Sequence, residues 1–266
     1  AMLLRWLDFL PVELDVAGLA AEAKRQLKVE ADYLQEADHA ERFARLLRSA
    51  PGIVVPRVHR DFTTRRILAL DFIESEPLED LAGEHVPQRT RDGIARRIED
   101  LMFRELFEFR LMQTDPNPAN YRYRRSTDSL VLLDFGSTLE IDQERVDGYR
   151  DICRAVIADD RQAIHRAAIR LGYLRDDTPA DSAAGVLEII GLVCLPLAHR
   201  GAYDFGASRL AQHTLDLGVE VAFREGLPTP PASTMFLHRK LVGTFMLCAM
   251  LRARIDVHRL VAPHLA

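Results

Sequence analysis

The sequence has little cysteine, with three residues in 266, at positions 153, 194 and 248. No two of them are spaced as C-x-x-C, and their number is odd. Structural zinc sites and the disulfide frameworks of secreted proteins need closely spaced or paired cysteines, so the sequence suggests neither class. The cysteine pattern therefore indicates a protein of a reducing compartment.

The sequence also lacks an excess of positive charge and a long apolar run. Its formal net charge is −5, which argues against a nucleic-acid partner. The most apolar stretch, residues 183–198, is interrupted by Glu188 and Pro196 and is shorter than the ~20 apolar residues that span a bilayer. We expect a core helix there, and neither a transmembrane segment nor a signal peptide.

The hydrophobic pattern predicts an α+β chain that is predominantly α. Apolar residues at helical spacing predict helices over residues 17–48 and 93–112, and everything after about Asp142 indicates helix and loop. Short β-rich or apolar runs predict strands at 53–56, 66–73 and 130–133, with a turn at 75–78 and a proline-rich loop at 114–118.

Three polar side chains in the middle of the chain are spaced as in the catalytic half of a protein kinase. Asn120 follows Asp115 by five positions, and Asp134 leads Asp134-Phe135-Gly136 at the end of an apolar strand. Phosphoryl transfer from ATP needs one carboxylate to orient the attacking hydroxyl, and a carboxylate with an amide oxygen to hold Mg²⁺. Alone, Asp115-Pro116-Asn117 is typical of an Asx-turn, and an Asp before a glycine turn often only caps a strand. The combination favours a kinase-like site.

The stretch from Arg104 to Tyr121, with Gln113-Thr114-Asp115-Pro116 at its centre, closely resembles the catalytic loop of the UbiB/AarF atypical kinases, which support ubiquinone (coenzyme Q) biosynthesis. Residues 30–36 (EADYLQE), 132–138 (LLDFGST) and 237–243 (LHRKLVG) are similar to further family motifs. The likeness extends over residues 17–256 and is nearest to the mitochondrial-type members. It implies a protein-kinase-like fold with a helical C-lobe.

The resemblance implies a role for each matching residue. Asp115 corresponds to the catalytic-loop aspartate, and Asn120 and Asp134 correspond to the Mg²⁺ ligands. Glu36 corresponds to the glutamate of helix C, which pairs with the nucleotide-binding lysine. The hinge whose backbone contacts adenine corresponds to residues 71–73, namely Asp71, Phe72 and Ile73.

Glu30 and Asp32 resemble the acidic pair of the family, which closes the substrate side and restrains ordinary protein-kinase activity. On a regular helix Asp32 shares a face with Glu36, whereas Glu30 lies about 200° around from Asp32. The three acids therefore cannot all face one point. The alternative is that Glu30 and Asp32 are solvated helix residues.

The N-terminal part departs from a complete kinase. A kinase needs a lysine on a strand before helix C and a loop over the phosphates. The only lysines before Glu36 are Lys24 and Lys28, within the predicted helix, and no Gly-rich or Ala-rich loop precedes them. We therefore expect residues 1–74 to be a remnant of the N-lobe, with helix C and hinge strands, and residues 75–266 to be the helical C-lobe. The Ala-Met start favours a chain that begins midway through a longer protein over a gene that encodes a short form.

Two other features leave alternatives open. His238, Arg239 and Lys240 lie on an otherwise apolar helix, where they would face an anionic ligand or lipid headgroup, or serve in capping and at the surface, which is the commoner case. A second Asp-Phe-Gly begins at Asp204, but it follows Gly201 in a region predicted to be helical. We do not expect a second metal site there.

Two classes of function remain. The first is an atypical kinase or ATPase that uses ATP and Mg²⁺ in ubiquinone biosynthesis. On its own this chain would then bind Mg·ATP weakly and turn over little, because the lysine and the phosphate loop are absent. The second is a non-catalytic, pseudokinase-like scaffold that binds lipid or quinone precursors or other biosynthetic proteins. In either case we expect the bacterial cytoplasm or another intracellular location, with peripheral membrane contact left open.

Overall fold

The computed structural model describes residues 32–83, 85–222 and 232–266. Its first helix, α3 (Tyr33–Leu46), begins directly after Asp32, whose carboxylate accepts a hydrogen bond from the N–H of Leu34 at 3.1 Å. Asp32 has extended backbone angles, so the prediction of a helix that runs through this residue is wrong. The physical reason is capping, because an Asp side chain satisfies a free N–H of the first turn. The part of the predicted helix before residue 32, including Glu30, lies outside the described residues.

A four-stranded sheet lies beneath α3, with the strand order β1 (Ile53–Val54), β5 (Ser129–Leu132), β4 (Tyr121–Arg124) and β2 (Glu76–Pro77). β1 is parallel to β5, and the other two pairings are antiparallel. The predicted strand at 130–133 is confirmed. The predicted turn at 75–78 is wrong, because Glu76 and Pro77 pair with Tyr123 and Arg122. The sheet thus contains strands from both sides of residue 74, and the division into two lobes stays a prediction.

The predicted strand at 66–73 is also wrong. This segment makes only two isolated bridges, between Val58 and Leu70 and between Thr64 and Ile67. No neighbouring strand of the described residues extends these bridges into a ladder, and Ile67 is exposed. A β-rich sequence without a partner strand stays irregular.

The helix before the catalytic loop ends earlier than predicted. α4 (Gln88–Arg104) continues into a π-helical turn, η3 (Glu105–Phe109), and Arg110 ends it in the left-handed conformation at φ 53°. Residues 111–112 belong to β3 (Leu111–Gln113), which pairs antiparallel with β6 (Thr138–Glu140). Because of this pairing, the last residues of the predicted helix are a strand, and this strand leads to Asp115.

The rest of the chain is mostly helical. The helices are α5 (Gln143–Ile157), α6 (Arg161–Arg170), α7 (Ala180–Val193), α8 (Leu195–Ala198), α9 (Leu210–Ala222), α10 (Ala232–Met250) and α11 (Val257–Val261), and a two-stranded ribbon joins β7 (Tyr203–Asp204) to β8 (Arg254–Ile255). Short 3₁₀ turns are η1 (Arg60–Phe62), η2 (Leu78–Ala82), η4 (Pro118–Asn120), η5 (Arg125–Thr127) and η6 (Ala262–Leu265). The apolar stretch 183–198 forms α7 and α8 with a break at Cys194, and Tyr203–Asp204 is a strand where a helix was expected.

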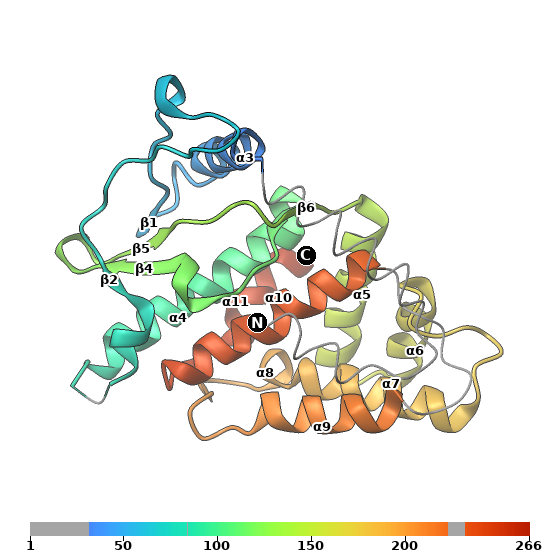
Figure 1. Ribbon diagram of the computed structural model, residues 1–266. Helices are drawn as coiled ribbons and strands as arrows, with labels where there is room; N and C mark the ends of the chain where they lie inside the picture. The colour runs from blue at the N-terminus through green and yellow to red at the C-terminus, as the bar shows by residue number, and fades with distance from the viewer. Residues whose placement is uncertain (1–31, 84, 223–231) are drawn as a thin grey trace.

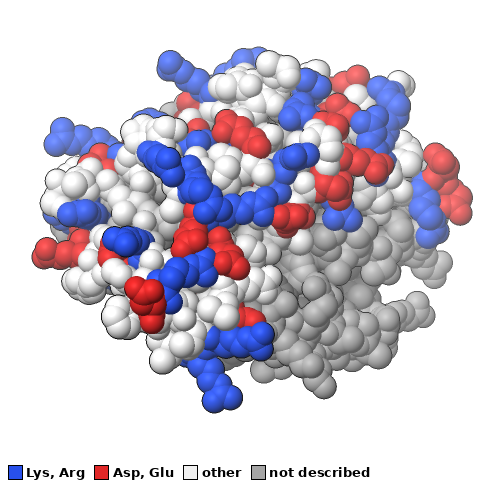
Figure 2. All heavy atoms as spheres, turned by 90° about the horizontal axis from the view of Figure 1, so that it is seen from above, with Lys and Arg blue, Asp and Glu red and all other residues white. Residues whose placement is uncertain are grey.

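Figure 1 shows how these elements are arranged. α3 lies at one end above the sheet, α4 and α10 run through the middle, and α7 and α9 lie at the other end. One apolar core includes buried residues of α3, α4, the sheet, α5, α10 and α11. Among the described residues, no helix is both long and apolar enough to cross a membrane. On the face seen in Figure 2, positive and negative side chains are intermixed.

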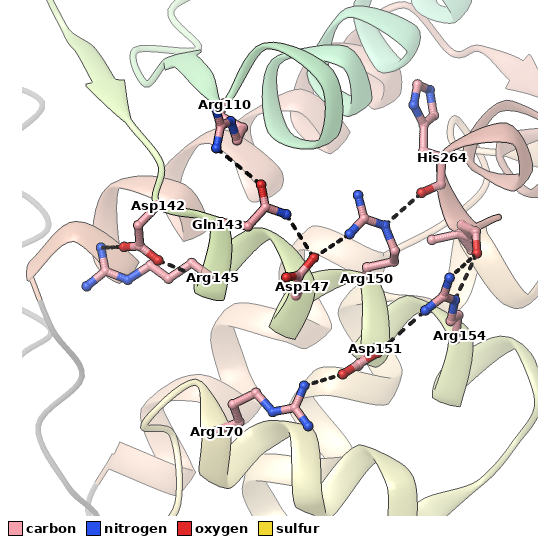
Figure 3. A network of polar contacts seen from close by, with 11 residues as sticks. Arg110, Asp142, Gln143, Arg145, Asp147, Arg150, Asp151, Arg154, Arg170 and His264 are labelled. Atoms are coloured by element: carbon pink, nitrogen blue, oxygen red, sulfur yellow. Dashed lines mark hydrogen bonds and ion pairs between the residues drawn. The ribbon is translucent and has the colours of Figure 1, made fainter.

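A polar network on α5 attaches the last residues of the chain (Figure 3). Arg150 donates to the carbonyl of His264 at 3.0 Å, and Arg154 donates to the carbonyl of Leu265 at 2.8 and 2.6 Å. These carbonyls lie near the end of η6, where backbone acceptors lack helical partners. The two arginines therefore provide the hydrogen bonds that the end of this helix cannot make internally.

Candidate functional site

The loop after β3 brings two of the predicted site residues together. Asp115 follows the strand, and the chain turns through η4, which the side chain of Asn117 caps by accepting from Ala119 N–H at 3.1 Å. Asn120 closes the turn, and its Nδ2 donates to the Asp115 carbonyl at 3.1 Å and to Asp115 Oδ2 at 2.9 Å. Within the described residues, no hydrogen bond reaches Asn120 Oδ1. This oxygen is free to accept from, or to bind, a ligand.

Asp134 reaches the same place from the neighbouring strand. β4 begins directly after Asn120 and pairs with β5, and Leu133 N–H donates to the Asn120 carbonyl at 3.0 Å. Asp134 Oδ1 accepts from Gly136 N–H at 2.9 Å. Burial raises the pKa of Asp134, the Gly136 hydrogen bond opposes this, and the charge of Asp115 raises the pKa further. The two carboxylates therefore lie within electrostatic reach of each other.

The donor set fits Mg²⁺. The available groups are the Asn120 amide oxygen and the Asp134 carboxylate, and both line a small cavity of about 10 Å³ between the catalytic loop and α4. In the described part of the chain, no cluster of three His, Cys, Asp or Glu residues could hold a metal. Mg²⁺ is typically bound by one or two carboxylates together with substrate phosphates and waters, rather than by an all-protein cage. The two oxygen donors are therefore compatible with Mg²⁺.

Helix α3 packs directly on the Asp134-Phe135-Gly136 segment. Phe135 N–H donates to Glu36 Oε1 at 3.4 Å, and the rings of Phe43 and Phe135 lie 4.9 Å apart between centroids. His39 Nδ1 lies 3.1 Å from the Phe135 carbonyl, and burial lowers the pKa of His39. The neutral ring must carry its proton on Nδ1, because a carbonyl only accepts. Glu36 thus faces the Asp134-Phe135-Gly136 segment, and its pairing with a lysine stays a prediction.

The predicted acidic pair is not brought to this site by any contact of the described residues. Asp32 caps α3, and its other partner is the Nε of Arg65, at 3.9 Å. Both contacts lie at the start of α3, away from Asp115 and Asn120. The carboxylate of Asp32 is used in this cap, and its carbonyl accepts from Glu36 N–H at 3.3 Å. Glu30 lies outside the described residues.

The predicted hinge is an irregular segment at the edge of the molecule. Asp71 N–H donates to the Arg57 carbonyl at 2.9 Å, and Asp71 Oδ1 pairs with His59 at 2.6 Å. The Phe72 side chain is 91% exposed. Among the described residues, the N–H groups of Phe72 and Ile73 make no backbone hydrogen bond. They are free for a ligand, and the contact with adenine stays a prediction.

Of the two alternatives left open for the basic cluster, the commoner one, a capping or surface role, is wrong for Lys240. Lys240 is 1% exposed and forms an ion pair with Glu105 at 3.0 Å. Its neighbour Arg239 donates to the Thr114 carbonyl at 2.7 Å and to Ser137 Oγ at 3.1 Å. An ammonium on an otherwise apolar helix was the signal for a buried partner, since charges are seldom buried unpaired. Arg239 thus contacts the loops that carry Asp115 and Asp134, and Lys240 contacts Gln113 and Tyr121 on either side of the first loop.

The second Asp-Phe-Gly has a different environment. Asp204 pairs with Arg254 at 2.8 Å across the β7–β8 ribbon, and its Oδ1 accepts from Ala207 N–H at 3.0 Å. Asp204 therefore has a structural role in the ribbon and the turn that follows.

Comparisons with known proteins identify the family of this chain. A family model described as the ABC1 atypical kinase-like domain matches residues 1–168. The chain is 38% identical over 244 residues to the rat mitochondrial atypical kinase COQ8B, covering 90% of this chain and 46% of that protein. It is 30% identical to the Saccharomyces cerevisiae mitochondrial atypical kinase COQ8, covering 97% of this chain and 52% of that protein. The chain thus spans about half the length of these relatives.

A solved structure shows the same fold. Rv3197 from Mycobacterium tuberculosis, in complex with erythromycin, superposes with a TM-score of 0.72 at 18% identity and covers 96% of this chain and 63% of that chain. This confirms the predicted kinase-like, predominantly helical fold. The family model and the relatives confirm the resemblance drawn from the motifs. The chain belongs to the ABC1 atypical kinase-like family.

Proposed function

We propose that this chain carries the Mg·ATP site of an atypical kinase or ATPase that supports ubiquinone biosynthesis. The observation that supports this best is the position of Asn120. Its amide nitrogen holds the Asp115 carboxylate at 2.9 Å, and its backbone carbonyl accepts from Leu133, the residue before Asp134. One residue thereby links the aspartate that orients the attacking hydroxyl to the carboxylate that holds the metal.

The proposed roles follow from the chemistry of each group. Mg²⁺, when bound, neutralises the negative charge of the phosphates. Asn120 Oδ1 and Asp134 hold the ion, and Asp115 orients the hydroxyl or water that attacks and accepts its proton. Glu36 pairs with a nucleotide-binding lysine, and residues 71–73 contact adenine through their backbone.

The proposed partners and cellular location rest only on the family to which the chain belongs. Candidate partners are a lipid or quinone precursor and other proteins of ubiquinone biosynthesis, met at a membrane surface. The Rattus and yeast relatives are both named as mitochondrial atypical kinases. Glu30 and Asp32 act in this proposal as the family's acidic pair on the substrate side.

The test compares the two Asp-Phe-Gly segments of the same chain. Calorimetric titration of this chain with Mg·ATP is expected to show weak binding. An ATP hydrolysis assay is expected to show little turnover. Asp134→Asn should lower the affinity by about tenfold or more, the equivalent of about 1.4 kcal/mol. Asp204→Asn is the matched control and should leave the affinity unchanged, because Asp204 is paired with Arg254.

Further outcomes separate the enzymatic function from the scaffold function. Asp115→Asn should retain nucleotide binding and lose the residual turnover, because this residue acts on the acceptor and not on the metal. Equal effects of Asp134→Asn and Asp204→Asn would contradict the proposal. If Asp134→Asn in the full-length protein abolished ATP hydrolysis and still supported ubiquinone production in cells, the scaffold function would replace it.

A further inference from the structure

Lys240 is the only lysine after residue 28, and it is buried behind the catalytic loop. Its Nζ lies 3.0 Å from Glu105 Oε2, 3.1 Å from the Tyr121 hydroxyl and 3.4 Å from Gln113 Oε1. Burial alone would lower the pKa of Lys240, but Glu105 and Tyr121 raise it above its ordinary value. The ammonium therefore stays charged inside the protein.

The ammonium determines which way the Gln113 amide points. An ammonium has only donors, so it must meet Oε1 and not Nε2 of the amide. Nε2 then faces the opposite side, where it donates to the Asp115 carbonyl at 2.8 Å. A flipped amide would place two donors together at Lys240 and two acceptors together at Asp115, so only one orientation is stable.

The Asp115 carbonyl accepts two hydrogen bonds, from Gln113 Nε2 and from Asn120 Nδ2. A continuous path of contacts thus runs from Lys240 through Gln113 to the backbone of Asp115. The same helix, α10, touches the loop twice more. Arg239 binds the Thr114 carbonyl, and Gly243 lies so close to Pro116 that an added Cβ would be 2.0 Å from its Cγ.

We propose that Lys240 is a positioning residue of the catalytic loop, whose charge orients the Gln113 amide and thereby fixes the backbone at Asp115. The positioning itself rests on these contacts, and its consequence for turnover rests on the proposed function. Lys240 touches neither Asn120 nor Asp134, and it reaches Asn120 only through the shared Asp115 carbonyl. We therefore expect the larger effect on the acceptor side of the site and the smaller one on nucleotide binding.

A purely structural ion pair with Glu105 is the competing explanation. The double variant Glu105→Gln/Lys240→Met separates the two, because it removes both charges and leaves no unpaired charge buried. Gln at position 105 keeps an oxygen for the Gln113 N–H, which Glu105 Oε1 accepts at 3.4 Å. If the pair served stability alone, the double variant would fold with a wild-type loop.

Hydrogen-exchange mass spectrometry of the full chain tests the proposal. In the double variant, amides of residues 111–121 should exchange about tenfold faster, as expected for a local opening made easier by the loss of roughly one hydrogen bond. Amides of α5 and α6 should keep wild-type rates. Thr244→Val is the matched control, because Thr244 is fully buried one turn further on the same helix and its hydroxyl has no partner in the described structure.

Gln113→Met gives an independent test should the double variant not fold. It should accelerate exchange of the same loop to a similar degree, and adding it to the double variant should change little, because both act through one path. Wild-type loop exchange in Gln113→Met, or in a folded double variant, would overturn the proposal. Where turnover is measurable, the double variant should lower kcat and leave the KM for ATP unchanged. Absence of Mg·ATP binding by the wild-type chain would refute the proposed function, whereas the exchange rates still decide the positioning.

Discussion

Gly243 provides a sharp test of how α10 is docked on the catalytic loop. Glycine inside a helix normally costs about 1 kcal/mol relative to alanine, so Gly→Ala usually stabilises a helix. At Gly243, however, the Cβ of alanine would lie 2.0 Å from Pro116 Cγ and 2.5 Å from Pro116 Cβ. These separations are well below van der Waals contact, so the helix or the loop must move.

The expected magnitude follows from the two opposing effects. Overpacking of this kind typically costs about 1–3 kcal/mol, and occasionally more. Pro116 is a rigid ring next to Asp115, so it cannot relieve the clash by a rotamer change. After the gain of about 1 kcal/mol in helix propensity, Gly243→Ala should lower the free energy of unfolding by up to about 2 kcal/mol.

Gly191 is the matched control. It lies in α7, and a Cβ added there meets no described atom within 4 Å. Gly191→Ala should therefore raise the free energy of unfolding by about 0.5–1 kcal/mol. Both variants can be measured by urea denaturation at constant pH. Opposite signs are expected, and a stabilising effect of Gly243→Ala would refute the close approach of α10 to the loop.

Three further predictions concern the pH dependence and the stability of the fold. Burial raises the pKa of Glu99 to about 8 from 4.5, so its stabilising contribution is full below pH 4.5 and is lost as the pH rises toward 8. Wild type should lose about 3 kcal/mol from this residue between pH 5 and 8, and Glu99→Gln should remove that slope in pH-dependent urea denaturation. Arg150→Ala should cost about 1–2 kcal/mol and Arg154→Ala less than about 1 kcal/mol, because the Arg154 side chain is more exposed. Phe43→Ala should cost about 3–5 kcal/mol by thermal or urea denaturation, whereas Phe62→Ala, at an exposed ring, should cost less than about 0.5 kcal/mol.

Each of these has a contradicting outcome. An unchanged pH slope in Glu99→Gln would mean that another group titrates between pH 5 and 8. A larger loss for Arg154→Ala than for Arg150→Ala would mean that the carbonyl of Leu265 carries the docking of the last residues. Equal effects of Phe43→Ala and Phe62→Ala would contradict the packing of α3 on the metal-binding segment.

The location of the candidate site could be predicted because its residues are close in sequence. Asp115, Asn120 and Asp134 lie on one strand–turn–strand unit, and the register of β4 with β5 follows from a short connection. Local turn chemistry and a buried apolar strand are enough to place such residues together. The kinase-like spacing predicted that these three side chains form one site, and the structure brings Asn120 into hydrogen-bond contact with Asp115. Their catalytic and metal-binding roles stay predictions.

The ends of the elements could not be predicted in the same way. Helical periodicity continues through Leu111 and Met112, yet pairing with β6 makes them a strand. Residues 66–73 have a strand-like composition, yet no described strand completes them. In both cases the presence or absence of a partner strand distant in the sequence decides between conformations that differ little in local energy.

The residues and their spacing were enough to identify the family, the predominantly helical kinase-like fold and the motifs of the candidate site. These depend on residue identity and spacing along one segment of the chain. Only the tertiary structure decided what lies behind that segment. It placed Lys240 and Gly243 of α10, more than 100 residues away, against Gln113 and Pro116. Burial changes the meaning of such residues, because a lysine that is solvated on a surface costs nothing, whereas a buried one must be paired and so orders its neighbours.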